Sequence, residues 1–304
     1  MSATKKIIVL GSSGFIGRNL CPYLEQNRLE VIRVDCSGTV DVSIDALDQG
    51  HMHSLMEKYK PDCIVNLIGY TDESKPEMMY RLNVFPFINI AEALLKLKLN
   101  SRVILFSSAA EFGEPIIKMP LKEDDTKIPV SHYGNAKYAQ SLAAQVYHKH
   151  YGLDVIIGRP FNIIGNDMSP KLVPACFVDQ FLRDPGSNNA VELKTNNLDP
   201  VRDFISITDV VSAIYTMITA GESGKSYNIS SGAGLSIREI IGLIARTTST
   251  PRYTVIEDTT PDKRNTITYS VGDNSKLKDL GWICTSTVEE GVKNLVTTWK
   301  GTRG

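Results

Sequence analysis

A serine, a tyrosine and a lysine are the residues of this chain whose types and spacing point most directly to chemistry. Ser108 ends an apolar run, and Tyr133 lies four residues before Lys137 in the segment YGNAK. Residues four apart on a helix share one face, so the lysine cation can lower the pKa of the phenol from its usual value of about 10. Such a phenol can exchange a proton with a carbonyl or an alcohol while a hydride moves, and the serine hydroxyl can bind the same oxygen. A surface Tyr/Lys pair beside a strand-end serine is the simpler interpretation of the three residues alone.

A glycine-rich turn near the N-terminus is typical of a dinucleotide site. The apolar run 5–10 indicates a buried strand, and it leads into GSSGFIG, with Gly11, Gly14 and Gly17, just before an expected helix. The glycines allow a tight turn, and the N–H groups and dipole at the start of a helix attract a pyrophosphate. Because the spacing is GxxGxxG rather than GxGxxG, a tight structural turn is the alternative interpretation.

An acidic residue after the second expected strand bears on the choice of cofactor. Strand 30–35 ends in Asp35, and a carboxylate at this point can bind both ribose hydroxyls and repel a 2′-phosphate. The sequence therefore predicts NAD(H) as the cofactor. Arg33 lies nearby and keeps NADP(H) possible.

Composition excludes several other classes of function. Lys and Arg number 33 against 34 Asp and Glu, a net charge of −1, so neither nucleic acid nor a membrane surface is an expected partner. The five cysteines are scattered without metal-ligand spacing, so we expect no metal site and reduced thiols. With no apolar signal core and no apolar stretch of about 18 residues, the chain is expected to be soluble and cytoplasmic.

Alternating elements in the first half predict the fold class. Helices are expected at 48–59, 77–97 and 133–151. Each is followed by an expected strand, at 63–68, 102–107 and 154–158 respectively. This order predicts an α/β fold with a doubly wound parallel (Rossmann) sheet, whose ligands bind at the carboxyl ends of the strands. We expect an NAD(P)-binding domain over residues 1–165 and a smaller, mainly substrate-binding lobe over 166–304, with some of its segments returning to the first domain. Later helices are expected at 208–219, 237–247 and 288–299, the second opened by a capping box of Ser236 and Glu239.

Taken in order, these motifs resemble the extended short-chain dehydrogenases/reductases of the epimerase/dehydratase family, which act on nucleotide sugars. The resemblance spans nearly the whole chain through GSSGFIG, Asn66-Leu-Ile-Gly69, Asn83-Val84, Ser107-Ser-Ala-Ala-Glu-Phe-Gly113, YGNAK, Arg159-Pro-Phe-Asn162, Arg202-Asp-Phe204 and Tyr227-Asn-Ile-Ser230. It implies that Tyr133 is the general acid/base, that Lys137 binds the nicotinamide ribose and that Ser108 holds the reacting sugar oxygen. It places NAD(P) against Phe15, Ile16, Asp35, Asp45, Ala46, Leu67, Gly69, Asn83 and Phe161.

The resemblance also implies contacts to a nucleotide-diphosphate sugar substrate. Asn162 and Arg202 would bind its phosphates, where a guanidinium suits a diphosphate. An ion pair between Arg202 and Asp203 is the alternative, and Lys171 and Arg264 are further candidates for the diphosphate. A homodimer through helices 77–97 and 133–151 is expected from the resemblance as well.

Departures from the family's motifs reduce the number of reactions that the chain is expected to catalyse. Ala109 and Ala110 stand where 4,6-dehydratases carry an Asp-Glu pair, and Ala110 replaces the cysteine that GDP-fucose synthases use for epimerisation. The greatest similarity is to GDP-4-keto-6-deoxymannose reductases, although Tyr70-Thr-Asp-Glu73 replaces their Ala-rich segment. We therefore expect NAD(P)H-dependent reduction of the C4 ketone of a nucleotide-linked 4-keto-6-deoxy sugar, in the synthesis of deoxysugar precursors of surface glycans. A nucleotide-sugar 4-epimerase is the alternative, and a non-catalytic NAD(P)-binding sensor is a distant one.

Overall fold

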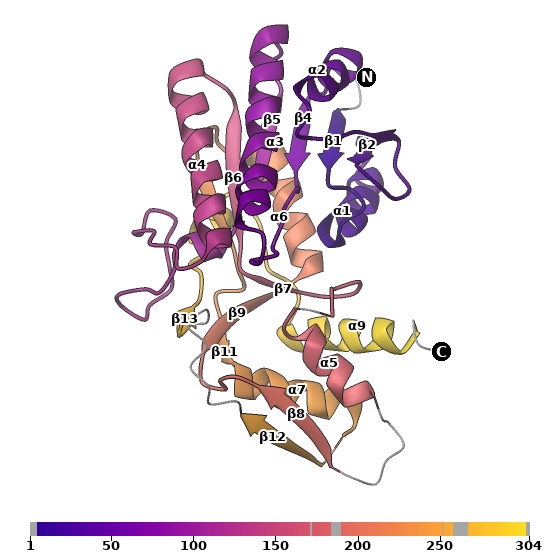
Figure 1. Cartoon of the computed structure of the whole chain (residues 1–304), viewed down its shortest axis with the longest axis vertical. Coiled ribbons are helices and arrows are strands. Elements are labelled where there is room, and N and C mark those ends of the chain that lie inside the picture. The colour runs from indigo at the N-terminus through magenta and orange to yellow at the C-terminus, as the bar shows by residue number, and fades with distance from the viewer. Residues whose placement is uncertain (1–4, 171, 184–189, 251, 258–266, 302–304) are drawn as a thin grey trace.

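A seven-stranded parallel sheet forms the upper part of the molecule (Figure 1). The computed structural model describes residues 5–170, 172–183, 190–250, 252–257 and 267–301. Every pairing in this sheet is parallel. Its strands are, in spatial order, β10 (Ser226–Ile229), β6 (Val155–Pro160), β5 (Arg102–Phe106), β4 (Cys63–Asn66), β1 (Lys6–Leu10), β2 (Glu30–Asp35) and β3 (Val42–Ser43). The order reverses between β1 and β4, which is where doubly wound sheets bind their ligands. The predicted fold class is confirmed.

Helices cover both faces of this sheet because its strands are apolar on both sides. On one face, α2 (Gln49–Tyr59), α3 (Pro76–Leu97) and α4 (His132–Tyr151) bury side chains against the strands. On the other face lie α1 (Phe15–Gln26) and α6 (Ile207–Ala220). Both α6 and β10 come from the second half of the chain, so that half contributes to the Rossmann layer as well as to its own lobe.

The smaller lobe lies below the sheet and has its own core (Figure 1). Its β9 (Val201–Ser206) pairs with β7 (Asn162–Ile164), β11 (Gly234–Ser236) and β13 (Tyr269–Ser270), and β8 (Val191–Thr195) pairs with β12 (Tyr253–Glu257). The helices α5 (Ala175–Leu182), α7 (Ile237–Thr248) and α9 (Val288–Gly301) pack together there, while the short α8 (Ser275–Asp279) lies against β10. Since β7 already pairs with β9, the chain leaves the upper sheet directly after Pro160.

Local hydrogen bonds explain where the helices begin. Asp48 accepts a bond from the His51 N–H at 2.9 Å, and Ser131 accepts one from the Gly134 N–H at 3.0 Å. These bonds satisfy N–H groups that a helix start leaves unpaired. The predicted capping box of Ser236 and Glu239 is present at α7. None of the helices in the described ranges is long and apolar enough to cross a membrane, and no group of His, Cys, Asp or Glu in these ranges is placed to hold a metal ion.

Candidate active site

A cavity of about 450 Å³ lies at the carboxyl ends of the central strands, where they meet the smaller lobe. Most of the predicted site residues line it: Gly11, Gly14, Phe15, Ile16, Gly17, Leu67, Gly69, Ser108, Tyr133, Lys137, Phe161 and Asn162. The fold therefore brings the glycine loop and the Ser/Tyr/Lys set to one space, although more than 90 residues separate Gly17 from Ser108.

The glycine loop is shaped by close backbone contacts. Gly11 has φ +81°, a left-handed conformation that glycine adopts without strain. A Cβ on Gly17 would lie 2.5 Å from the Gly11 carbonyl oxygen, so only glycine fits where α1 crosses the loop. The third glycine of the motif thus serves the packing of helix against strand, as in dinucleotide-binding folds.

This loop fits a dinucleotide pyrophosphate. Helix α1 begins after Gly14 with no capping side chain and no acidic residue in its first turn among the described residues. Its first N–H groups and its positive dipole end therefore remain available to an anion. The buried Ser12 Oγ in the same loop has no hydrogen-bond partner in the described part of the chain, which leaves a further polar group for a ligand.

Asp35 lies at the end of β2 beside the glycine loop, outside the cavity wall. Its carboxylate accepts hydrogen bonds from the Ser13 N–H at 3.1 Å, the Ser13 hydroxyl at 2.5 Å and the Cys36 N–H at 2.7 Å. Arg33 is turned away to Glu25, with Nη2 2.8 Å from the carboxylate, and this bond raises the pKa of Arg33. The guanidinium that would accommodate a 2′-phosphate is thus paired within the protein.

The other predicted cofactor residues, Asn83, Asp45 and Ala46, also lie outside the wall. Asn83 is buried in α3 and donates to the carbonyls of Tyr70 and Met79, both at 2.8 Å, while its Oδ1 accepts from the Tyr70 N–H at 3.3 Å. It therefore holds the loop that follows Gly69. Asp45 accepts a bond from the Leu47 N–H at 2.9 Å, and the Ala46 carbonyl accepts one from Asn89 at 2.9 Å.

Ser108, Tyr133 and Lys137 meet at one wall of the cavity. Ser108 follows β5 and caps the 3-10 turn η1 (Ala109–Glu111), its Oγ accepting from the Ala110 N–H at 3.1 Å. Its hydroxyl also lies close enough to the Tyr133 phenol to lower the pKa of that group. Tyr133 lies in the first turn of α4, and Lys137 lies one turn later and is buried. The Lys137 Nζ donates to the carbonyls of Phe106 at 2.9 Å and Ile68 at 3.4 Å.

The electrostatics of this set differ from the prediction. Burial raises the pKa of Tyr133, and the nearby Ser108 hydroxyl only partly opposes this effect. Burial lowers the pKa of Lys137 to about 8. The expectation that Lys137 lowers the pKa of the phenol is therefore wrong in this structure, because loss of water around the phenol dominates. Tyr133 is accordingly a neutral proton donor at pH 7.

Arg202 is not part of the cavity wall. Its Nη1 donates to the Val201 carbonyl at 3.0 Å and its Nη2 to the Ile267 carbonyl at 2.7 Å. Asp203 is engaged elsewhere, because its carboxylate accepts bonds from Ser231, Gly232 and Gly272. Asn162 lines the cavity and donates to the Asp203 carbonyl at 2.9 Å. Lys171 and Arg264 lie outside the described residues.

Several residues of the wall were not predicted from the sequence. They are Thr71, Phe106, Ser107, Pro160, Ile163, Met168, Leu172 and Val173. Thr71 belongs to the segment 70–73 that departs from the family's Ala-rich pattern, which is the signal that could have identified it. In the same segment, the Glu73 carboxylate accepts a hydrogen bond from the Tyr133 N–H at 3.1 Å, so this loop is attached to the start of α4.

Comparison with a family model shows which family this chain belongs to. The model of the NAD dependent epimerase/dehydratase family matches residues 7–230. The chain belongs to this family. The match runs from β1 to the end of β10 and thus includes the glycine loop, Ser108, Tyr133 and Lys137.

Individual relatives in the epimerase/dehydratase family match over nearly the whole chain. GDP-6-deoxy-D-talose 4-dehydrogenase of Aggregatibacter actinomycetemcomitans is 32% identical over 281 residues, which cover 90% of each chain. GDP-6-deoxy-D-mannose reductase of Pseudomonas aeruginosa is 26% identical over 98% of each chain. The solved structure of RMD from Pseudomonas aeruginosa with NADPH superposes with a TM-score of 0.87 at 25% identity and covers 98% of each chain. The resemblance predicted from the motifs is confirmed.

Proposed function

We propose that this member of the epimerase/dehydratase family reduces the C4 ketone of a nucleotide-linked 4-keto-6-deoxy sugar with NAD(P)H. The observation that carries this proposal is the presence of Ser108, Tyr133 and Lys137 in the wall of the cavity that also contains the glycine loop. Two hydroxyls at one point suit a carbonyl oxygen that gains negative charge. The names of the 32% and 26% identical relatives, a 4-dehydrogenase and a reductase of GDP-6-deoxy sugars, support the same reaction type.

The dinucleotide would be held by the glycine loop and by Lys137, and when bound it supplies the hydride. NAD(H) is the proposed form because Asp35 lies where a 2′-phosphate would be repelled and Arg33 is paired with Glu25. The RMD structure contains NADPH. The proposed preference for NADH therefore depends on Asp35 and Arg33 of this chain, and comparing the binding of the two cofactors tests it. A lower dissociation constant for NADH than for NADPH is the expected result.

The protein's own groups perform the proton chemistry. The Tyr133 phenol, whose pKa burial raises further above neutrality, is protonated at pH 7 and can donate that proton to the carbonyl oxygen. The Ser108 hydroxyl binds the same oxygen and stabilises the charge that develops on it. The Lys137 ammonium faces the same wall and would stabilise the phenolate that Tyr133 becomes. Apolar residues such as Phe161, Met168 and Leu172 form part of the wall of this space.

The nucleotide diphosphate is the part of the substrate that the smaller lobe would bind. Asn162 already lines the cavity. Arg202 is half-buried, and its guanidinium donates hydrogen bonds to the main-chain carbonyls of Val201 and Ile267. We propose that it binds a phosphate, because a guanidinium hydrogen-bonds phosphate oxygens more strongly than neutral carbonyls. GDP is the proposed nucleotide, following the two relatives.

A panel of substrates tests the reaction. GDP-, dTDP-, CDP- and UDP-linked 4-keto-6-deoxy sugars are mixed with the protein and either NADH or NADPH, and the loss of absorbance at the nicotinamide band is followed. Oxidation with a GDP-linked ketone is the expected result. NMR of the product then assigns C4, since 6-deoxymannose and 6-deoxytalose differ only there. No oxidation with any of the donors would overturn the proposal.

A 4-epimerase is the second candidate, because UDP-glucose 4-epimerases also match, one of them at 26% identity over 81% of each chain. An epimerase uses the same hydroxyls but oxidises and re-reduces one sugar without net consumption of cofactor. Protein that carries tightly bound NAD and interconverts UDP-glucose and UDP-galactose without added reductant would favour it.

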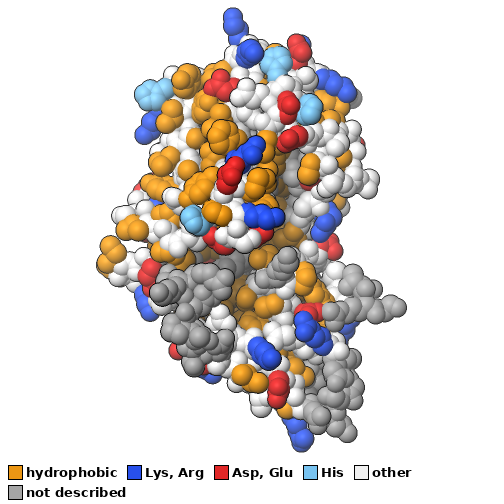
Figure 2. Space-filling model, viewed as in Figure 1, with side chains coloured by type: hydrophobic (Ala, Val, Ile, Leu, Met, Phe, Trp, Pro, Cys, Tyr) orange, Lys and Arg blue, Asp and Glu red, His pale blue; other side chains and the backbone are white. Residues whose placement is uncertain are grey.

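We also propose that the protein is a cytoplasmic homodimer. Phe85 of α3 and Leu142, Val146 and Tyr151 of α4 are exposed apolar side chains, and the two helices pack side by side. Hydrophobic side chains gather on this face of the molecule (Figure 2). Pairing of these helices with those of a second copy would bury them.

A further inference from the structure

A buried carboxylate lies directly behind the Ser/Tyr/Lys set. Glu111 is the last residue of η1, three residues after Ser108, and its side chain is 0% exposed. Its Oε2 accepts a hydrogen bond from the Arg159 Nε at 2.7 Å, and Arg159 is only 1% exposed. The proposed proton transfer does not use either residue.

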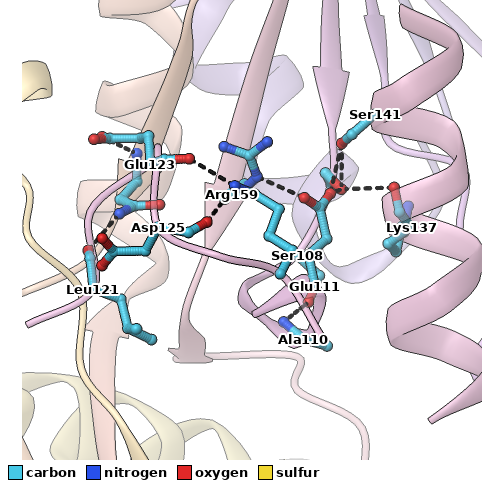
Figure 3. Close-up of polar contacts among 12 residues, drawn as sticks. Ser108, Ala110, Glu111, Leu121, Glu123, Asp125, Lys137, Ser141 and Arg159 are labelled. Carbon is cyan, nitrogen blue, oxygen red and sulfur yellow. Dashed lines mark hydrogen bonds and ion pairs between the residues drawn. The ribbon is translucent and has the colours of Figure 1, made fainter. Parts of the chain in front are cut away.

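The second carboxylate oxygen of Glu111 is bound by two serines. The Ser141 hydroxyl donates to Oε1 at 2.5 Å, and the Ser107 hydroxyl makes a further short bond to the same oxygen. The Ser107 Oγ also lies 3.3 Å from the Lys137 carbonyl oxygen. Figure 3 shows the carboxylate between Arg159 on one side and helix α4, with Ser141 and Lys137, on the other.

The partners of Glu111 lie next to residues of the active site in the chain. Ser107 precedes Ser108, Ser141 lies one helical turn after Lys137, and Arg159 precedes the Pro160–Asn162 stretch of the wall. One carboxylate therefore connects β5, α4 and β6 at the points where they enter the cavity.

An aromatic contact continues this connection into the cavity wall. The Arg159 guanidinium lies 5.9 Å from the centre of the Phe112 ring, and that ring stacks on Phe161 with the centres 6.4 Å apart. Phe161 itself lines the cavity. A shift of Arg159 would thus reach the wall through two packed rings.

Stability alone does not account for a charged pair at this depth. Removing two charges from water costs several kcal/mol per ion, and apolar residues of similar volume are often as stabilising. A carboxylate that receives three hydrogen bonds from three elements instead determines their separation, because each bond is sensitive to distance and angle.

We propose that Glu111 and Arg159 are positioning residues that hold Ser108, Lys137 and Phe161 at the separations required for turnover. This inference rests on the proposed ketoreductase function. It adds that kcat depends on an ion pair that touches neither cofactor nor substrate. The charge of Glu111 acts in the same sense on Lys137, since it raises the pKa of that amine against the effect of burial and so favours the ammonium form.

Graded variants test the proposal. Glu111→Gln keeps the shape of the side chain but removes its charge, and Ser141→Ala removes one of the three donors. Asp154→Asn is the matched control, because Asp154 forms an ion pair with Arg102 at 2.9 Å at the opposite end of β5 and β6. We expect kcat to fall about 10- to 100-fold in Glu111→Gln, since misplacement by about 1 Å costs that order of rate. In Ser141→Ala we expect a fall of about 3- to 10-fold.

The KM for the sugar nucleotide and the Kd for the dinucleotide should change by no more than about threefold in these variants, since neither Glu111 nor Ser141 touches a ligand. Asp154→Asn should keep the wild-type kcat. An unchanged kcat in folded Glu111→Gln and Ser141→Ala would overturn the proposal, as would an equal loss in Asp154→Asn at a similar melting temperature. If Glu111→Gln does not fold, Ser141→Ala decides by the same criteria.

A measurement that needs no substrate separates this proposal from the proposed function. Amide hydrogen exchange, followed by mass spectrometry, should be faster at residues 107–111 and 134–141 in both variants and unchanged there in Asp154→Asn. Faster local exchange in a protein that reduces none of the ketones would support the positioning role and reject the ketoreductase. Unchanged exchange in a protein whose wild-type form is active would reject the positioning role alone.

Discussion

At the scale of single residues, the chemistry depends on how burial changes the protonation of Tyr133 and Lys137. The phenol is protonated at neutral pH and can act in the reductive direction, because a ketone must receive a proton as the hydride arrives, although the raised pKa makes it a weaker acid. Lys137 has its pKa lowered to about 8 by the same burial. The two residues therefore differ from an exposed Tyr/Lys pair, which would titrate near its usual values.

Tyr133→Phe should abolish most turnover while leaving the cavity intact. Loss of the proton donor is expected to lower kcat by about 10²–10⁴, and the Kd for dinucleotide should stay within about threefold of wild type, since the ring is kept. Tyr138→Phe, on the same helix, is the control and should be fully active. Steady-state kinetics and dinucleotide fluorescence give the two numbers, and near-wild-type turnover of Tyr133→Phe would contradict the role of the phenol.

The pKa of Lys137 predicts a pH dependence of stability. Its folded-state pKa of about 8 lies below its ordinary value of 10.5, so between these pH values the unfolded chain binds a proton that the folded chain does not. The contribution of Lys137 to the free energy of unfolding therefore rises with pH from about 8 to 10. Urea unfolding of wild type and Lys137→Met should show their difference moving in favour of wild type over this range.

The control for this measurement is Lys149→Met, at an exposed position of the same helix. Its difference from wild type should stay constant across the same pH range. A constant difference for Lys137→Met as well would mean that the buried amine does not lose its proton near pH 8.

At the scale of elements, the crossing of α1 over the glycine loop leaves no room for a side chain at Gly17. A Cβ there would lie 2.5 Å from the Gly11 oxygen and 2.6 Å from the Ser12 Cα, both backbone atoms that cannot rotate away. The loop and the helix start would have to separate, which would move the N–H groups proposed to bind a pyrophosphate. Element packing and cofactor binding are therefore linked at this position.

Gly17→Ala should weaken dinucleotide binding by about tenfold or more and lower the free energy of unfolding by about 1–3 kcal/mol, the usual range for overpacking. Gly242→Ala in α7 is the matched control, because its Cβ would meet only the Arg246 Nη1, at 3.7 Å. That change should stabilise the protein by about 0.5–1 kcal/mol. Isothermal titration with NADH and chemical unfolding test both variants, and equal effects at the two glycines would contradict the packing argument.

At the scale of the whole molecule, the Rossmann layer and the smaller lobe meet at the cavity. Phe15 packs against the core of the Rossmann layer and against the core of the smaller lobe, and it lines the cavity between them. The exposed apolar residues of α3 and α4 lie over the other face of the sheet from α1 and α6. The active site and the proposed dimer face are thus separate surfaces, so disruption of one need not alter the other's chemistry.

A double substitution of Leu142→Asp and Val146→Asp should convert the dimer to a monomer, because two charges would be buried in an apolar contact. Light scattering coupled to gel filtration measures the mass. Ile283→Asp, at an exposed apolar residue outside α3 and α4, should leave the mass unchanged. A wild-type protein that is monomeric at micromolar concentration would contradict the proposed interface.

The sequence by itself determined the parallel sheet, the glycine loop and the Ser/Tyr/Lys set, because each depends on a short pattern of residue types. Tertiary structure alone decided the direction of the Tyr133 pKa shift, since burial is set by segments distant in the chain. It also decided the partners of Arg202, the identity of α6 and β10 as the segments that return to the upper sheet and the pairing of Glu111 with Arg159, 48 residues apart. These features depend on which distant segments meet, and local spacing carries no information about such contacts.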